Sequence, residues 1–239
     1  MTWLRRNRGA GPGDRDGAAV GRRSGPRGET PWWEQRDQAF AERDHLEPRD
    51  FGRGWLPAPM LNNAELLEPL GGDAASVEVS EARRARKLTA LNDGVAWRRR
   101  EGNVLAVLRV EIYADQDPGK ERVAHRNAWT VQAEASLDAT WRERWADRGV
   151  TPGWIEARWV VPADRPEPPS LGSAADVDWL RVEDHTGDRM SVAVYEYLTV
   201  WAGRSQGTLT IRHEHTLNLD AEAAGAASAL HASLLGLDA

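Results

Sequence analysis

The chain has 239 residues, with 31 lysines and arginines against 37 aspartates and glutamates, and its formal net charge at pH 7 is −6. This length suffices for one large domain or two small ones, and hydrophobic residues, which make up 41% of the chain, suffice for a core. Because cysteine is absent, disulfides, thiolate catalysis and cysteine-based metal centres are excluded. The negative charge argues against a nucleic-acid-binding core.

Residues 1–28 are rich in arginine, glycine and proline and poor in apolar side chains. A segment of this composition buries too little surface to fold, so we expect a disordered tail. No apolar region follows the first arginines, and no stretch approaches the ~18 apolar residues that indicate a membrane span. We therefore expect a cytoplasmic protein whose single domain covers residues 29–239.

The first helix is predicted from Thr30-Pro31, which combines an N-cap residue with a first-turn proline. It should end before Pro48 and carry Trp33 and Phe40 on one face. Shorter elements are expected next: a helix over 63–70, a strand over 77–79, and a stretch over 81–91 that fits either helix or strand.

A hairpin is predicted around residues 100–103, a turn sequence between apolar strands over 95–99 and 104–113. Residues 123–133 are interpreted as a further strand, followed by a helix from Ser136 to Gly149. The alternative for this region is one long helix that continues to Arg148.

The last hairpin organises the predicted sheet, with strands over 191–202 and 208–218. A four-residue loop over 203–206 would pair Ala202 with Gly207 and place Glu196 opposite His213. A helix over 221–235, rich in alanine, then closes the domain.

An internal repeat is suggested because Gly54-Trp55 recurs as Gly153-Trp154, and because strands, a helix and a glycine follow both. The predicted fold is α+β: an antiparallel sheet built from two strand–strand–helix repeats, with helices packed on the sheet. The pseudo-repeats cover about 54–149 and 153–237.

Three ionisable residues, Glu196, His213 and His215, interrupt the apolar face of the last hairpin. Burying them unpaired would be costly, so they should pair with each other or contact water or a ligand. Histidines two apart on a strand lie roughly 7 Å apart and can share a metal ion, with Glu196 as the third ligand. A metal such as zinc is therefore one alternative, and a salt-bridged cluster at the edge of the core is the other. No other cofactor is predicted.

Three aromatic residues, Tyr195, Tyr197 and Trp201, form a stripe on the opposite face of the same strand. Such a stripe can bind a sugar or a partner protein. If both faces of the sheet are packed against helices, a helix would instead cover and bury this stripe.

Three segments carry a family resemblance. They are an acidic, proline-containing stretch that ends in Phe51-Gly52-Arg53-Gly54-Trp55, the sequence Pro169-Ser170-Leu171-Gly172, and the strand–turn–strand–helix of 191–237. They resemble extracytoplasmic sensor domains of actinobacterial serine/threonine kinases and related lipoproteins. The resemblance implies an antiparallel sheet with helices and a cleft for an unidentified ligand, and it implies no catalytic residues. This chain departs from that family in having no cysteine, no predicted signal and no predicted anchor.

We predict a non-catalytic domain that binds a small ligand or a protein through Glu196, His213, His215 and the aromatic stripe. The first alternative is a metal-dependent enzyme that uses Glu196 and the two histidines. The second is a structural or assembly protein.

Overall fold

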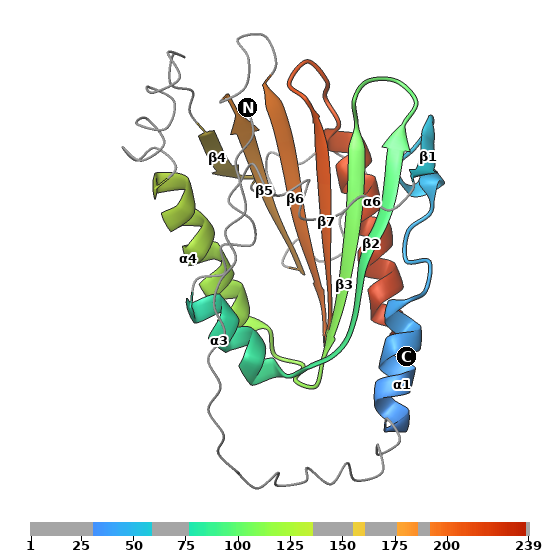
Figure 1. The fold of residues 1–239 in the computed structure, drawn as a ribbon, viewed down its shortest axis with the longest axis vertical. Helices are drawn as coiled ribbons and strands as arrows, with labels where there is room; N and C mark the ends of the chain where they lie inside the picture. The colour runs from blue at the N-terminus through green and yellow to red at the C-terminus, as the bar shows by residue number, and fades with distance from the viewer. Residues whose placement is uncertain (1–30, 59–76, 136–154, 161–175, 186–191, 238–239) are drawn as a thin grey trace, which may run out of the picture. The chain divides into compact units, whose positions relative to one another are not determined.

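A computed structural model describes residues 31–58, 77–135, 155–160, 176–185 and 192–237, which belong to one compact unit. Within these residues, seven strands form a single sheet in which every neighbouring pair is antiparallel (Figure 1). Across the sheet the order is β1 (Trp55–Ala58), β2 (Leu88–Arg99), β3 (Leu105–Tyr113), β7 (Ser205–Glu214), β6 (Ala193–Ala202), β5 (Val177–Asp184) and β4 (Ile155–Trp159).

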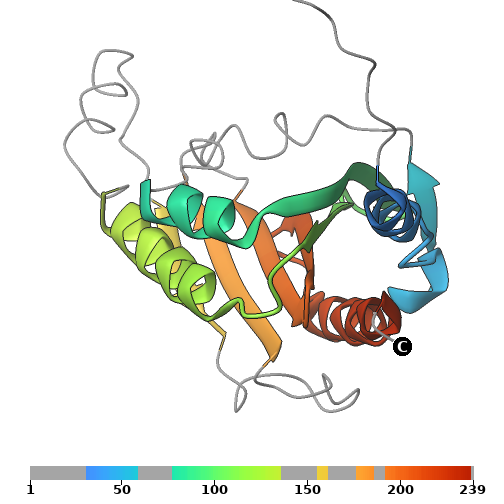
Figure 2. The same ribbon diagram turned by 90° about the horizontal axis from the view of Figure 1, so that it is seen from below.

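Helices lie on both faces of this sheet. Figure 2 shows α1 (Trp32–Ala41) and α6 (Asp220–Leu234) on one side, and α3 (Val77–Arg86) beside α4 (Gly119–Ala135) on the other. The short 3₁₀ helices Pro48–Asp50 and Leu235–Leu237 complete the described elements. The predicted α+β class with an antiparallel sheet is therefore confirmed. No helix in the described ranges is long and apolar enough to cross a membrane.

The main core lies between the sheet and the face that carries α1 and α6. Leu198, Leu209 and Ile211 of the central strands are fully buried there. Gly207 lets α6 approach closely, because a Cβ atom at this position would lie 2.8 Å from Leu230 Cδ2. Because side chains alternate along a strand, every second residue of the central strands lies under α6, and the residues between them lie on the face of α3 and α4.

The turn between β6 and β7 is two residues shorter than predicted. Ala202 pairs with Ser205 across Gly203-Arg204, and Gly203 has a φ of 55°. The predicted four-residue loop and its pairing with Gly207 are therefore wrong, and Glu196 stands opposite Ile211 instead of His213. Since the register shifts by two residues, an even number, the predicted assignment of side chains to the two faces survives.

The predicted strand over 123–133 is wrong, because these residues lie in α4. The buried residues Glu121 and Ala124 are three apart, which is a helical spacing. Val123 is exposed, whereas a central strand would have buried it on one face. The helix is described as far as Ala135; the remainder of the long-helix alternative and the predicted helix over 136–149 lie outside the described residues.

Two further boundaries near the N-terminus are corrected. The predicted strand over 77–79 is the first turn of α3, which ends where Lys87 adopts a φ of 58° and turns the chain into β2. In α1, Phe40 is buried as predicted, but Trp33 is exposed and Trp32 is 72% exposed. The buried face of α1 is formed instead by Asp37, Phe40 and Ala41.

The hairpin of β2 and β3 and the final helix α6 are confirmed, the latter within one residue at each end. The tail over 1–28, the predicted helix over 63–70 and residue Thr30 fall outside the described residues. The internal repeat stays a prediction. However, the strand expected over 123–133 in its first half lies in α4.

Candidate functional site

Glu196 is the acidic group that interrupts the apolar face of β6, and its side chain is only 1% exposed. Its Oε2 accepts a hydrogen bond of 2.6 Å from the indole Nε1 of Trp179, and its Oε1 accepts one of 2.6 Å from Arg181 Nε. Both donors come from β5, in which residues 179 and 181 point to the same face as Glu196. The buried carboxylate is therefore fully supplied with donors from the neighbouring strand.

Arg181 continues this network toward α6. Its Nε binds Glu196, and its Nη2 binds Asp220, the first residue of α6. Burial alone would lower the pKa of Arg181, but the two carboxylates outweigh burial and raise it. Asp220 thereby ties the start of α6 to the sheet.

His213 lies against the same carboxylate from β7. Its Nε2 is 3.4 Å from Glu196 Oε1, and its Nδ1 is 2.9 Å from the carbonyl oxygen of Glu214. Because both ring nitrogens face oxygen acceptors, the ring donates to both only when it is doubly protonated. The side chain is buried, so the pair is shielded from bulk water.

The pKa of Glu196 follows from this environment. Burial opposes ionisation and would raise the pKa, but the donors His213, Arg181 and Trp179 favour the carboxylate and lower it below the ordinary value. The carboxylate is thus kept ionised in the interior by hydrogen bonds and one guanidinium.

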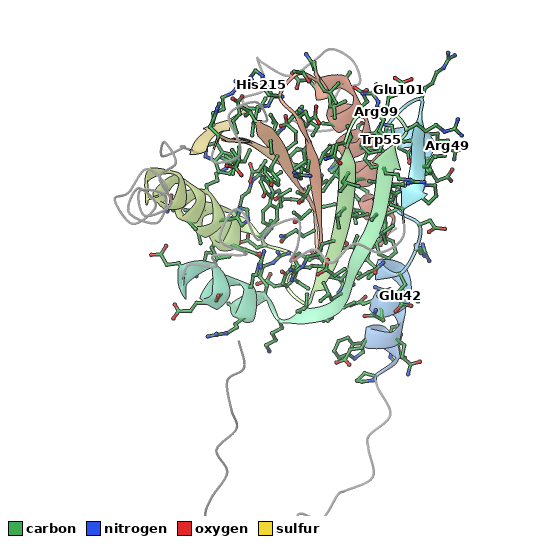
Figure 3. The ribbon with its side chains drawn as sticks, turned by 45° about the horizontal axis from the view of Figure 1, so that its top comes forward. Glu42, Arg49, Trp55, Arg99, Glu101 and His215 are labelled. Carbon is green, nitrogen blue, oxygen red and sulfur yellow. The ribbon has the colours of Figure 1, made fainter. Side chains whose placement is uncertain are left out.

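His215 does not join this cluster. The strand β7 ends at Glu214, so the alternation that would have kept His215 on the face of His213 ends with it. The His215 side chain is 59% exposed, and its Nε2 lies 3.9 Å from Glu183 Oε2. Figure 3 places His215 at the margin of the molecule. Glu183 is also 3.5 Å from His185 Nε2.

The three residues proposed as metal ligands are therefore not brought together: Glu196 and His213 are neighbours, and His215 is paired elsewhere. Within the described residues, no group of three or more histidine, aspartate or glutamate side chains has the arrangement to hold a metal ion. The sequence spacing alone could not reveal this separation, because the predicted shared face of His213 and His215 requires the strand to continue past Glu214.

A cavity of about 170 Å³ opens beside this network, where β5 and β7 end and β6 and α6 begin. Its exposed margin is formed by His215 and Asn218. Its lining residues are Arg181, Glu183, Val194, His213, His215, Leu217, Asn218 and Asp220. The cavity thus combines partly exposed carboxylates and imidazoles with two apolar side chains.

The aromatic stripe lies on the opposite face of β6, as predicted, but all three side chains are buried. Tyr195 and Tyr197 stack with their ring centroids 6.3 Å apart, and Trp201 Nε1 donates a hydrogen bond of 3.2 Å to Asp178. The stripe is therefore separate from the cavity. Its three side chains are buried within the protein and do not form an exposed surface for a ligand.

Sequence reasoning did not single out Trp179, which binds Glu196, or Arg181 and Asp220, which line the cavity. The signal that could have found the first two is the alternation of β5, whose odd-numbered residues face Glu196 across the strand pair. Asp220 carries no such signal, since its contact with Arg181 depends on where α6 returns to the sheet.

No protein-family model matches the chain, and no curated protein shows significant similarity to it. The resemblance to kinase sensor domains therefore stays a prediction.

Proposed function

We propose that this chain is a non-catalytic binding domain whose cavity takes a small cation or the basic side chain of a partner. The observation that supports this proposal is the pair of partly exposed carboxylates, Glu183 and Asp220, in one cavity. A carboxylate at an opening accepts hydrogen bonds from an ammonium or guanidinium group more strongly than a neutral acceptor does.

The charge around the cavity supports a cationic ligand. Glu183, Asp220 and the buried Glu196 stand against one guanidinium, that of Arg181, which leaves a formal charge of −2 when the histidines are neutral. Arg181 is already engaged by two carboxylates, so its positive charge is largely neutralised within the protein. An incoming cation therefore meets a negative potential at the opening.

The size of the cavity limits the ligand. A volume of about 170 Å³ is below the ~300 Å³ at which drug-sized ligand pockets begin, and it suits a single amine or guanidine group with a short apolar stem. Val194 and Leu217 supply the apolar surface for that stem. The histidine, histidine and glutamate arrangement needed for metal-dependent catalysis lacks comparable support, because His215 lies apart from Glu196.

Calorimetric titration with butylammonium and butylguanidinium, compared with neutral 1-butanol, tests the proposal. We expect the two cations to bind and butanol not to bind, and we expect added salt to weaken the cations, because the opening is exposed. Glu183→Gln should weaken cation binding by at least about tenfold, the loss of one charge-assisted hydrogen bond.

The matched control is Glu101→Gln, which makes the same chemical change at an exposed turn residue outside the cavity. Equal affinities for the cations and for butanol would contradict the proposal. So would equal effects of the two glutamine variants.

A further inference from the structure

A second polar cluster lies on the other face of the sheet, at the end away from the cavity, where α3 meets β3 and β7. Arg86, the last residue of α3, is 3% exposed, and its guanidinium Cζ lies 3.9 Å from the ring centroid of Tyr113. Its Nη1 donates hydrogen bonds to Glu121 Oε2 at 2.7 Å and to Gln206 Oε1 at 3.3 Å.

Four atoms of this cluster are buried without a hydrogen-bond partner among the described residues: Nε and Nη2 of Arg86, Nε2 of Gln206 and the hydroxyl of Tyr113. The Nε and Nη2 groups form one edge of the guanidinium plane. Arg122 uses that same edge to bind the two oxygens of Asp178, at 2.8 and 2.9 Å. In Arg86, no carboxylate in the described part of the chain lies opposite this edge.

Every one of these four atoms can donate a hydrogen bond. The Arg86 and Gln206 nitrogens can only donate, and the Gln206 amide cannot be reversed because its oxygen accepts from Arg86. Burial raises the pKa of Tyr113, so its hydroxyl keeps its proton. The oxygens of Glu121 are already taken by Arg83 and Arg86, so this carboxylate does not supply the acceptor for the free edge.

The charges of the surrounding layer do not balance either. Arg83, Arg86 and Arg109 stand against the buried carboxylates of Glu111 and Glu121, which leaves one positive charge. Arg109 is engaged by Glu111 at 2.8 Å, and Arg83 by Glu121 at 3.0 Å. A water molecule can accept from the free donors, but it cannot neutralise the remaining charge.

We propose that the Arg86–Gln206–Tyr113 cluster binds a small planar anion of the carboxylate class. Two oxygens in one plane match the free Nε and Nη2 groups, in the manner of Asp178 on Arg122. Gln206 is 0% exposed, so a ligand at this site would be enclosed by the protein, and formate, the smallest carboxylate, is the appropriate probe. This site lies on the other face of the sheet from the cavity and goes beyond the function proposed for that cavity.

The test is calorimetric titration of the full chain with sodium formate at constant ionic strength, with sodium chloride as the reference salt. Formate should bind with one site per chain, and melting curves should show stabilisation by formate beyond that by chloride. Arg86→Lys keeps a cation beside Glu121 but lacks the paired donors. It should weaken formate binding by at least about tenfold.

A second variant covers the case in which Arg86→Lys does not fold. Gln206→Glu places a carboxylate in the cluster and removes the surplus positive charge, so formate binding should be lost. The matched control is Gln116→Glu, the same change at an exposed loop residue, which should bind formate like the parent chain. Equal responses of the parent chain to formate and chloride would overturn the proposal and leave water as the partner of these donors. Undiminished formate binding by Gln206→Glu would overturn it as well.

Discussion

Glu196 shows how a carboxylate is tolerated within an apolar face at the scale of single residues. The indole of Trp179, the guanidinium of Arg181 and the imidazole of His213 surround it, so three donors replace the water that burial removes. The cost of desolvation is offset only while these partners stay in place. Removing the Glu196 carboxylate should therefore destabilise the protein mainly because its buried donors lose their acceptor.

Replacing Glu196 with alanine should destabilise the protein by about 3 kcal/mol, because Trp179 Nε1 would be left buried without an acceptor and Arg181 would keep only Asp220. Glu196→Gln should cost less, since the amide oxygen still accepts from one donor. Urea denaturation at pH 7 measures both changes. Glu214→Gln, an exposed position on the next strand, is the control and should shift stability by less than about 0.5 kcal/mol. A loss of similar size at both positions would show that the network adds nothing.

At the scale of elements, the two faces of the sheet hold their helices by different means. The helix α6 packs by close apolar contact, with Leu230 and Leu234 against the bare backbone of Gly207. The helix α4 is held by charge: Arg122 and Arg126, four residues apart on one helical face, both bind the buried Asp178 of β5. Both arginine side chains are partly exposed, so their guanidinium groups stay in contact with water while they bind Asp178. Arg122 also lies over the ring of Trp201.

The attachment of α4 should therefore depend on pH. Burial would raise the pKa of Asp178, but the hydrogen bonds from Arg122 and Arg126 outweigh it and lower the pKa below its ordinary value of 3.8. A lowered pKa in the folded state contributes stability that is present above the unfolded value and is lost as pH falls through the folded value. Asp178→Asn should thus destabilise the protein by about 2 kcal/mol at pH 7, and the difference should shrink below about pH 4.

Denaturation curves of Asp178→Asn and the parent chain between pH 3 and pH 8 measure this trend. The exposed Asp44→Asn is the matched control and should be close to neutral throughout. A difference between Asp178→Asn and the parent that grows toward acidic pH would contradict the assigned direction of the Asp178 pKa.

At the scale of the whole molecule, the two proposed binding sites lie at opposite ends of one sheet. The cavity lies where β5 and β7 end and β6 and α6 begin, whereas the Arg86 cluster lies near the turn between β6 and β7 (Figure 1). The edge of the sheet at β2 is also protected from pairing with another chain. The short β1 pairs with only the last four residues of β2, and Gln38 of α1 exchanges side-chain hydrogen bonds with the backbone of Leu91 nearer the start of β2. A side-chain amide there takes the place of a strand neighbour.

Removal of residues 1–28 should leave the stability of this unit unchanged, because the segment contributes almost no apolar surface to a core. Melting curves of the full chain and of a chain that starts at Glu29 should coincide within experimental error. A fall of many degrees on truncation would show that the segment packs on the domain.

The sequence by itself determined the features that follow from local periodicity. Alternation along residues 104–113 and 191–202 predicted the strands and the side chains that share each face. The face assignment survived the wrong turn length because the register error was an even number of residues. The final helix followed from its composition in the same way. Helix α4 was mistaken for a strand because the comparison of the two proposed repeats matched residues 123–133 with the strand over 208–218. The buried contacts of Glu121 and Arg122, which favour a helix, come from distant residues.

Only the tertiary structure decided which ionisable residues meet. Glu196 was predicted with His213 and His215, yet its two closest donors come from β5, whose place beside β6 no local pattern encodes. The end of β7 at Glu214 separated His215 from the cluster, and the return of α6 brought Asp220 to Arg181. The Arg86 cluster joins α3, β3, α4 and β7 across 120 residues of sequence. Charge pairing of this kind depends on distances in space that hydrophobic periodicity does not specify.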